Sequence, residues 1–295
     1  MNLDPTTPRR ARPVIALMGE FSAGKSTLAN LLLGERLSPV RVTATRLPPI
    51  WYTYGEGTPV RVDLDGARHP ISAAAIADVD PDDTAYVQVP LAAGVLELMD
   101  LVDMPGISDP NMAASTWKRL IHEADGVLWC THSTQAWRQS EAATWAELPP
   151  ALHENSLLLL TRADKLPTAA ARRRVVARVT AETEGMFASV LPVSLHHAAT
   201  AGQDRDAWEE SGAEAVTRGL LDIVFRLASA SRRRPKMIVP GKRAPAAAAD
   251  APADAAPALS PRARPVLPRR VTARGHGRSR PRLPHSAIRQ MMPTS

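Results

Sequence analysis

The residues whose types and spacing point most directly to chemistry form one stretch near the N-terminus. This stretch is Gly19, Glu20, Phe21, Ser22, Ala23, Gly24, Lys25 and Ser26. It matches the pattern G-x-x-x-x-G-K-[ST] without interruption, and glycines in such a loop let backbone N–H groups curve around phosphate oxygens. Lys25 would supply a positive charge to the β- and γ-phosphates, and Ser26 a hydroxyl ligand to Mg²⁺. The stretch therefore predicts a site for a nucleoside triphosphate with Mg²⁺.

Such a loop needs a strand before it and a helix after it, and the sequence provides both. Val14–Met18 is a short apolar run typical of a buried parallel strand. Thr27–Leu33 has helical spacing and is followed by Gly34, a residue common at helix ends. Thr27, at the start of this helix, is included among the expected nucleotide contacts because a helix N-terminus favours anions. The order predicts a P-loop α/β fold with a doubly wound, mostly parallel sheet.

A second group of candidate residues follows the next apolar segment. Leu96–Val102 is strand-like and leads into Asp103, Met104, Pro105 and Gly106. A carboxylate at this strand end can hold Mg²⁺ through water, which assigns Asp103 to the metal site. The N–H of Gly106 can bond to a γ-phosphate and move when that phosphate leaves.

A third group predicts which base is bound. Ser156–Leu160 is another buried-strand run and precedes Thr161, Arg162, Ala163, Asp164 and Lys165. A carboxylate at the position of Asp164 can accept two hydrogen bonds from guanine, which adenine cannot offer. Val190–Val193 predicts a short strand that ends at Ser194, where backbone could meet the guanine oxygen. This order of motifs is that of GTPases.

The string GEFSAGKST resembles the P-loop of the dynamin superfamily, and of bacterial dynamin-like proteins in particular. The resemblance covers about residues 12–230. Ala44–Pro48 is similar to switch I of these proteins, which implies that the Thr45 hydroxyl binds Mg²⁺, with Thr43 as a close alternative. It also implies hydrolysis of GTP to GDP and phosphate, a phosphoric anhydride hydrolysis, with Lys25, Ser22, Thr45 and Gly106 as the catalytic set.

The sequence departs from that family in three ways. Arg162 stands where the guanine motif usually has lysine, and its apolar stem and planar cation can still pack on a base. Phe21 stands where classical dynamins have a glutamine that orients water, so the backbone, switch I or a partner across a dimer would have to position the water. We therefore expect slow hydrolysis by the isolated monomer and activation by dimerisation or a partner. Third, we expect no long helical stalk, because Asp204–Arg234 allows one helix or two short ones.

Charge divides the chain into two unequal parts. Residues 231–295 contain 13 arginines and two lysines against two aspartates, so the net charge of this segment is +13. Residues 1–230 have a net charge of −7, and the whole chain has +6. The segment is rich in arginine, proline and alanine and has no aromatic residue, which predicts a disordered basic tail. We therefore expect a flexible N-terminus over residues 1–11, a G domain over 12–230 and the tail over 231–295.

The tail leaves several functions open. Its arginines could contact an anionic membrane surface or RNA electrostatically, or it could be a simple extension. The alternatives to a dynamin-like GTPase are a ribosome- or nucleic-acid-associated GTPase that uses the tail, and a nucleotide-gated scaffold with little turnover. One cysteine, no signal-peptide pattern and no long apolar run predict a cytoplasmic protein without a transmembrane segment, located peripherally at the membrane if the tail binds lipid.

Overall fold

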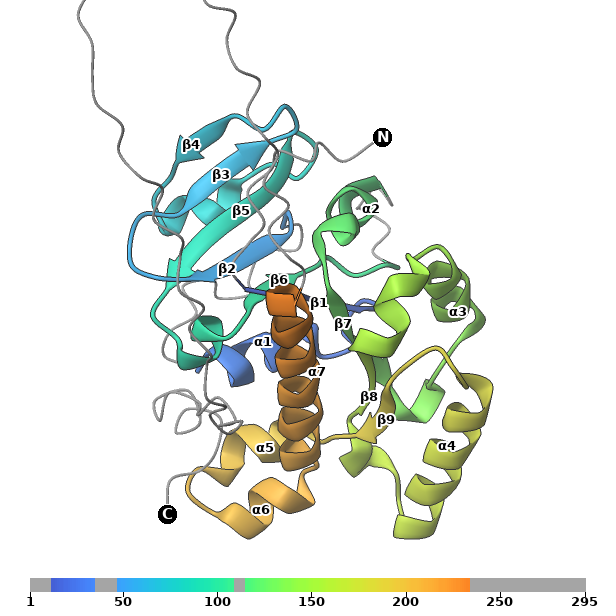
Figure 1. Cartoon of the computed structure of the whole chain (residues 1–295). Helices are drawn as coiled ribbons and strands as arrows, with labels where there is room; N and C mark the ends of the chain where they lie inside the picture. The colour runs from blue at the N-terminus through green and yellow to red at the C-terminus, as the bar shows by residue number, and fades with distance from the viewer. Residues whose placement is uncertain (1–11, 35–46, 109–114, 234–295) are drawn as a thin grey trace, which may run out of the picture. The chain divides into compact units, whose positions relative to one another are not determined.

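The computed structural model describes residues 12–34, 47–108 and 115–233. Their strands form one nine-stranded sheet in the order β4-β3-β5-β2-β6-β1-β7-β8-β9 (Figure 1). The strands are β1 Val14–Gly19, β2 Ile50–Tyr54, β3 Val60–Asp63, β4 Arg68–Pro70, β5 Thr84–Leu91, β6 Asp100–Asp103, β7 Gly126–His132, β8 Ser156–Thr161 and β9 Ser189–Pro192. Thr43, Thr45 and residues 234–295 of the expected tail lie outside the described residues.

The central part of the sheet is parallel, as the sequence predicts. Strand β1 pairs with β6 on one side and with β7 on the other, so that Ala16 lies opposite Val102 and Val127. Strands β8 and β9 continue the parallel order. The carboxyl ends of these strands therefore lie at one edge of the sheet, where ligands of open α/β folds bind. The predicted P-loop α/β fold class is confirmed.

Helices cover both faces of this sheet. They are α1 Lys25–Leu33, α2 Ser115–Leu120, α3 Gln139–Ala146, α4 Ala169–Glu182, α5 Leu195–Ala201, α6 Arg205–Glu210 and α7 Ala213–Arg233. Alternate side chains of β1 point to opposite faces, and the two cores reflect this. Ile15 and Leu17 pack in the core with residues of α1 and α7, whereas Ala16 packs with residues of α2, α3 and α4.

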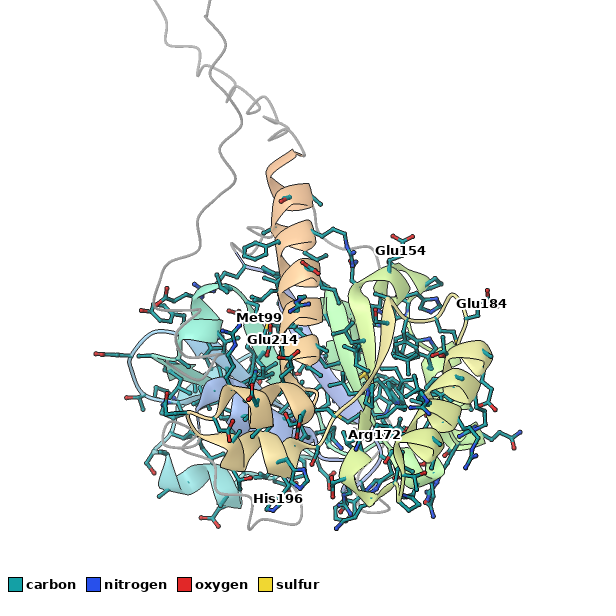
Figure 2. The ribbon with its side chains drawn as sticks, turned by 90° about the horizontal axis from the view of Figure 1, so that it is seen from below. Met99, Glu154, Arg172, Glu184, His196 and Glu214 are labelled. Carbon is teal, nitrogen blue, oxygen red and sulfur yellow. The ribbon has the colours of Figure 1, made fainter. Side chains whose placement is uncertain are left out.

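The sequence predicts one helix or two short ones over Asp204–Arg234, and the described residues form two helices of unequal length. The segment forms the short α6 and the long α7, and Gly212 separates them at a φ of 85°. A Cβ at Gly212 would come within 2.2 Å of the Pro192 carbonyl oxygen, so the chain can pass β9 closely only with glycine here. The view in Figure 2 shows α7 crossing one face of the domain, with Glu214 in its first turn.

An additional antiparallel region extends the sheet beyond β6. Strand β2 pairs antiparallel with β6 and parallel with β5, while β3 lies antiparallel to both β5 and β4. The strand before Asp103 is also shorter than predicted, because Gly94–Glu97 forms a 3-10 turn and β6 begins at Asp100. Among the described residues, no helix has both the length and the apolar composition that crossing a membrane requires.

Candidate nucleotide-binding site

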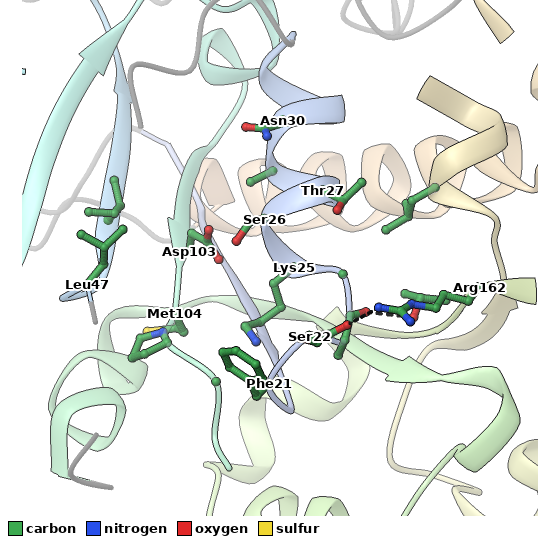
Figure 3. A pocket seen from close by; sticks show the side chains of 18 of the residues that line it. Phe21, Ser22, Lys25, Ser26, Thr27, Asn30, Leu47, Asp103, Met104 and Arg162 are labelled. Atoms are coloured by element: carbon green, nitrogen blue, oxygen red, sulfur yellow. Dashed lines mark hydrogen bonds between the residues drawn. The ribbon is translucent and has the colours of Figure 1, made fainter. Parts of the chain in front are cut away.

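The carboxyl ends of the parallel strands surround a cavity of about 700 Å³ (Figure 3). Most of the predicted site residues within the described part of the chain line it. These are Phe21, Ser22, Ala23, Gly24, Lys25, Ser26, Thr27, Asp103, Gly106, Thr161, Arg162, Asp164 and Lys165. Three predicted contacts, Gly19, Glu20 and Ser194, do not line the cavity. The fold thus brings to one place motifs as far apart in the sequence as Ser22 and Arg162, which are separated by 140 residues.

The loop between β1 and α1 has the backbone shape that phosphate binding requires. Gly19 has a φ of 138°, and a Cβ there would lie 2.0 Å from the Cys130 carbonyl oxygen. Ser22 has a φ of 58° and Gly24 a φ of 97°, so the chain turns through left-handed conformations before the helix begins. Left-handed residues in a tight loop turn successive backbone N–H groups toward one point, which is the geometry of an anion-binding nest.

Lys25 opens α1 and is 7% exposed. Its ammonium donates to the carbonyl oxygens of Gly19 at 3.1 Å and Glu20 at 2.8 Å. These two contacts hold the cation over the loop, so its charge is directed into the cavity that the loop encloses. Sequence reasoning predicted the residue; the carbonyls that orient it belong to the same loop.

Asp103 ends β6 beside Ser26 (Figure 3). Burial raises the pKa of this carboxyl from 3.8 to about 6, although the charge of Lys25 and a hydrogen bond with Ser26 lower it. Its Oδ1 atom is buried and has no hydrogen-bond partner in the described part of the chain. A desolvated carboxylate oxygen without a partner is costly unless a cation or its bound water satisfies it.

The segment after Asp103 lies against the phosphate loop. A Cβ on Gly106 would meet the Cα and backbone nitrogen of Phe21 at 3.0 Å, so glycine permits this close approach. The Phe21 N–H donates to the Ser108 hydroxyl at 3.1 Å. Phe21 as a whole is 62% exposed and lines the cavity, and its ring offers no group that could orient water.

Asp164 follows the end of β8 and lines the same cavity as Asp103. Burial raises its pKa, but hydrogen bonds, above all from Ser194, and the charges of Lys165 and His197 outweigh this and leave the pKa below 3.8. The Ser194 hydroxyl donates to Asp164 Oδ1 at 2.8 Å. The carboxylate is therefore ionised at neutral pH and oriented, as an acceptor for a base must be.

Ser194 has a different place from the predicted one. The sequence suggested that its backbone meets the base, but its N–H donates to the Ser211 carbonyl oxygen at 2.8 Å and the residue is 4% exposed. Ser194 lies behind Asp164, where its hydroxyl also caps α5. The next two residues, Leu195 and His196, line the cavity instead.

Thr161 and Arg162 connect the end of β8 with the phosphate loop. The buried Thr161 hydroxyl faces the carbonyl oxygens of Ala23 at 2.8 Å and Thr131 at 3.0 Å. Arg162 has a φ of 54° and donates to the Ser22 carbonyl oxygen at 3.1 Å. Arginine in place of the usual lysine therefore reaches the phosphate loop, and the two nucleotide motifs are held together by hydrogen bonds.

Several lining residues were not predicted from the sequence. They are Ala29, Asn30, Leu47, Pro48, Ile50, Tyr52, Met104, Pro105 and Leu195. Ile50 and Tyr52 belong to β2, whose place beside β6 depends on a long-range antiparallel pairing. Asn30 lies one turn after Ser26 on α1, and helical periodicity could have indicated it.

Known proteins with related sequences match the region that forms this cavity. The profile of the family described as 50S ribosome-binding GTPase matches residues 14–161. Dynamin-like protein 2 of Campylobacter jejuni is 28% identical over 160 residues, which is 52% of this chain and 26% of that protein. The isoniazid-induced protein IniC of Mycobacterium tuberculosis is 33% identical over 135 residues, or 42% of this chain and 27% of IniC.

A solved structure shows the same fold. It is described as an oligomerised bacterial dynamin pair that provides a mechanism for the long-range sensing and tethering of membranes. It superposes with a TM-score of 0.53 at 20% identity, over 75% of this chain and 36% of that chain. The chain covers about a quarter of the length of the curated relatives above. Part of the chain is similar in sequence to Dynamin-like protein 2. Because the family profile spans half of the chain, the chain belongs to the family described as 50S ribosome-binding GTPase.

Proposed function

We propose that this chain binds GTP with Mg²⁺ and hydrolyses it to GDP and phosphate. The observation that carries the proposal is the pairing of Lys25, held by two loop carbonyls, with a buried Asp103 oxygen that lacks a hydrogen-bond partner among the described residues. The first supplies a cation for phosphates and the second a ligand for a metal ion or its water. Both line the same cavity.

Ser26 and Asp103 fit Mg²⁺ because hydroxyl and carboxylate oxygens are the ligands that this ion prefers. Ser26 would bind the ion directly and Asp103 through water, and Thr45 is proposed as a further ligand outside the described residues. When bound, Mg²⁺ neutralises charge on the β- and γ-phosphates. Burial alone would keep the Asp103 carboxyl partly protonated near pH 6, and a bound cation would favour its ionised form.

In the proposed reaction, water attacks the γ-phosphorus, the bond to the β–γ bridging oxygen breaks, and GDP and phosphate leave. Lys25 and the loop N–H groups, including those around Ser22, stabilise the charge that develops on the phosphate oxygens. Gly106 would donate its N–H to the γ-phosphate. Asp164 would accept hydrogen bonds from guanine, and Arg162 and Lys165 would flank the base.

Nucleotide competition tests the choice of base. We expect GTP and GDP to displace a fluorescent GTP analogue, and ATP to require a concentration at least about 100-fold higher, because adenine leaves the Asp164 carboxylate unpaired. Equilibrium fluorescence titration in the presence of Mg²⁺ measures this ratio. If ATP competes as well as GTP does, the assignment of Asp164 is wrong.

Activation by pairing is the second part of the proposal. The Phe21 side chain has no polar group to orient the attacking water, and a second copy or another partner would supply or order one. We expect turnover per molecule to rise about tenfold or more as protein concentration increases from the nanomolar to the micromolar range. Phosphate release at saturating GTP measures this. A constant turnover number across that range would contradict pairing and favour a slow, monomeric switch.

A further inference from the structure

The carboxylate of Glu20, in the phosphate loop, bonds to two residues at the start of α3. Its Oε2 atom accepts from Arg138 Nη1 at 2.8 Å, and its Oε1 atom accepts from the Ser140 hydroxyl at 2.7 Å. The Glu20 side chain is 15% exposed and Arg138 is 47% exposed. Glu20 does not line the cavity. These three residues are called the Glu20 cluster below, and nothing in the function proposed above uses the Arg138 and Ser140 contacts.

The partners of Glu20 lie at the start of α3. Arg138 precedes the helix, and its backbone N–H donates to the Glu141 carboxylate at 3.0 Å. Glu141 is 1% exposed and also accepts from the Trp129 indole at 3.0 Å and the Thr131 hydroxyl at 2.8 Å. Because Trp129 and Thr131 belong to the central strand β7, the start of α3 is fixed to the sheet.

The main chain of Glu20 forms hydrogen bonds within the phosphate loop. Its carbonyl oxygen accepts from Lys25 Nζ at 2.8 Å and from the Ala23 N–H at 3.2 Å. The side chain therefore anchors the same peptide unit whose carbonyl orients the cation. Rotation of this unit would move the Lys25 ammonium relative to the phosphates.

We propose that Glu20 is a positioning residue whose bonds to Arg138 and Ser140 fix the direction of Lys25 during phosphoryl transfer. The inference rests on the GTP hydrolysis proposed above and assigns the Glu20 cluster a role in it. The orientation of a cation matters more in the transition state, where charge develops on the transferred group, than in the ground state. Loss of the cluster should therefore lower kcat more than it raises KM.

Two single variants and their combination test the proposal. Glu20→Gln keeps the shape and removes the charge, and Arg138→Gln removes the charge of a side chain that is 47% exposed. Arg218→Gln is the matched control, because Arg218 forms a comparable exposed ion pair with Glu214 at 3.0 Å on α7, away from the cavity. Steady-state GTP turnover of the full chain at one protein concentration gives kcat and KM, and thermal unfolding reports stability.

We expect kcat to fall about fivefold or more in both single variants, KM to stay within about twofold, and the double variant to match the single ones. Arg218→Gln should behave as wild type. Smaller falls in kcat, a change confined to KM, or effects that multiply in the double variant would overturn the positioning role. If wild type shows no GTP turnover, the proposed function is wrong as well as the positioning role. If wild type turns over GTP and the variants match it, only the positioning role of the Glu20 cluster is wrong.

Discussion

Replacing Lys25 with alanine is expected to weaken GTP binding at least about 100-fold. The ammonium is buried, two carbonyl oxygens orient it toward the cavity, and its charge-assisted bonds to phosphate would be lost. Each such bond to a charged group contributes about 1.5–3 kcal/mol, and the β- and γ-phosphates provide two acceptors. Titration of the variant with a fluorescent GTP analogue measures the loss.

Lys118→Ala is a suitable control for this experiment. Lys118 is one of the few lysines of the chain, and it pairs with Glu147 at 2.6 Å on the surface near α2 and α3. Its removal should leave GTP affinity within about twofold, since an exposed ion pair contributes little. A Lys25→Ala protein that keeps near wild-type affinity would show that the phosphates bind elsewhere.

Asp103→Asn should stabilise the nucleotide-free protein and at the same time abolish Mg²⁺-dependent GTP turnover. Burial raises the pKa of Asp103 to about 6 in the folded chain, above its ordinary 3.8. The folded state thus favours the neutral carboxyl. The contribution of Asp103 to the free energy of unfolding is fully present below pH 3.8 and is lost as pH rises through about 6. The penalty at neutral pH is on the order of 2–3 kcal/mol, and asparagine does not incur it.

Thermal unfolding of wild type and variant between about pH 4 and pH 8 checks this sign. The advantage of Asp103→Asn should be near zero at the acidic end and grow to roughly 5 °C or more above pH 6. Asp100→Asn, at the other end of β6, is the control. Its carboxylate already accepts from Arg12 at 3.1 Å and Trp51 at 3.2 Å, so asparagine should not stabilise the protein there. Equal stabilisation by both variants would contradict the account of Asp103.

The sequence was most informative where chemistry depends on short spacing. Lys25, Asp103 and Asp164 each follow an apolar strand, and because parallel strands end at one edge of a sheet, their convergence can be expected from the order of motifs alone. The residue types at these strand ends are also specific. A phosphate needs accessible backbone N–H groups, and guanine needs a hydrogen-bond acceptor. The cavity lining agrees with this reasoning for most of the predicted residues.

Other features depend on pairings that no local pattern encodes. Strand β5 lies parallel to β2 and antiparallel to β3, and which strand pairs with which is decided by the packing of the finished sheet. Strand β9 ends at Pro192, two residues before the predicted end at Ser194. Gly212 brings the α6–α7 junction against β9, and the Ser211 carbonyl accepts from the Ser194 N–H. Likewise, the distance of 118 residues between Glu20 and Arg138 hides their contact from the sequence.

The hydroxyl of Thr161 has one proton and faces two acceptors, the carbonyl oxygens of Ala23 and Thr131. It can therefore bond to one of them at a time, and exchanging partners leaves no buried donor unpaired. Ala23 belongs to the phosphate loop and Thr131 to the sheet. The loop can thus separate slightly from β8 when phosphates enter, while the proton turns toward the sheet, and this adjustment costs far less than breaking a bond that has no substitute.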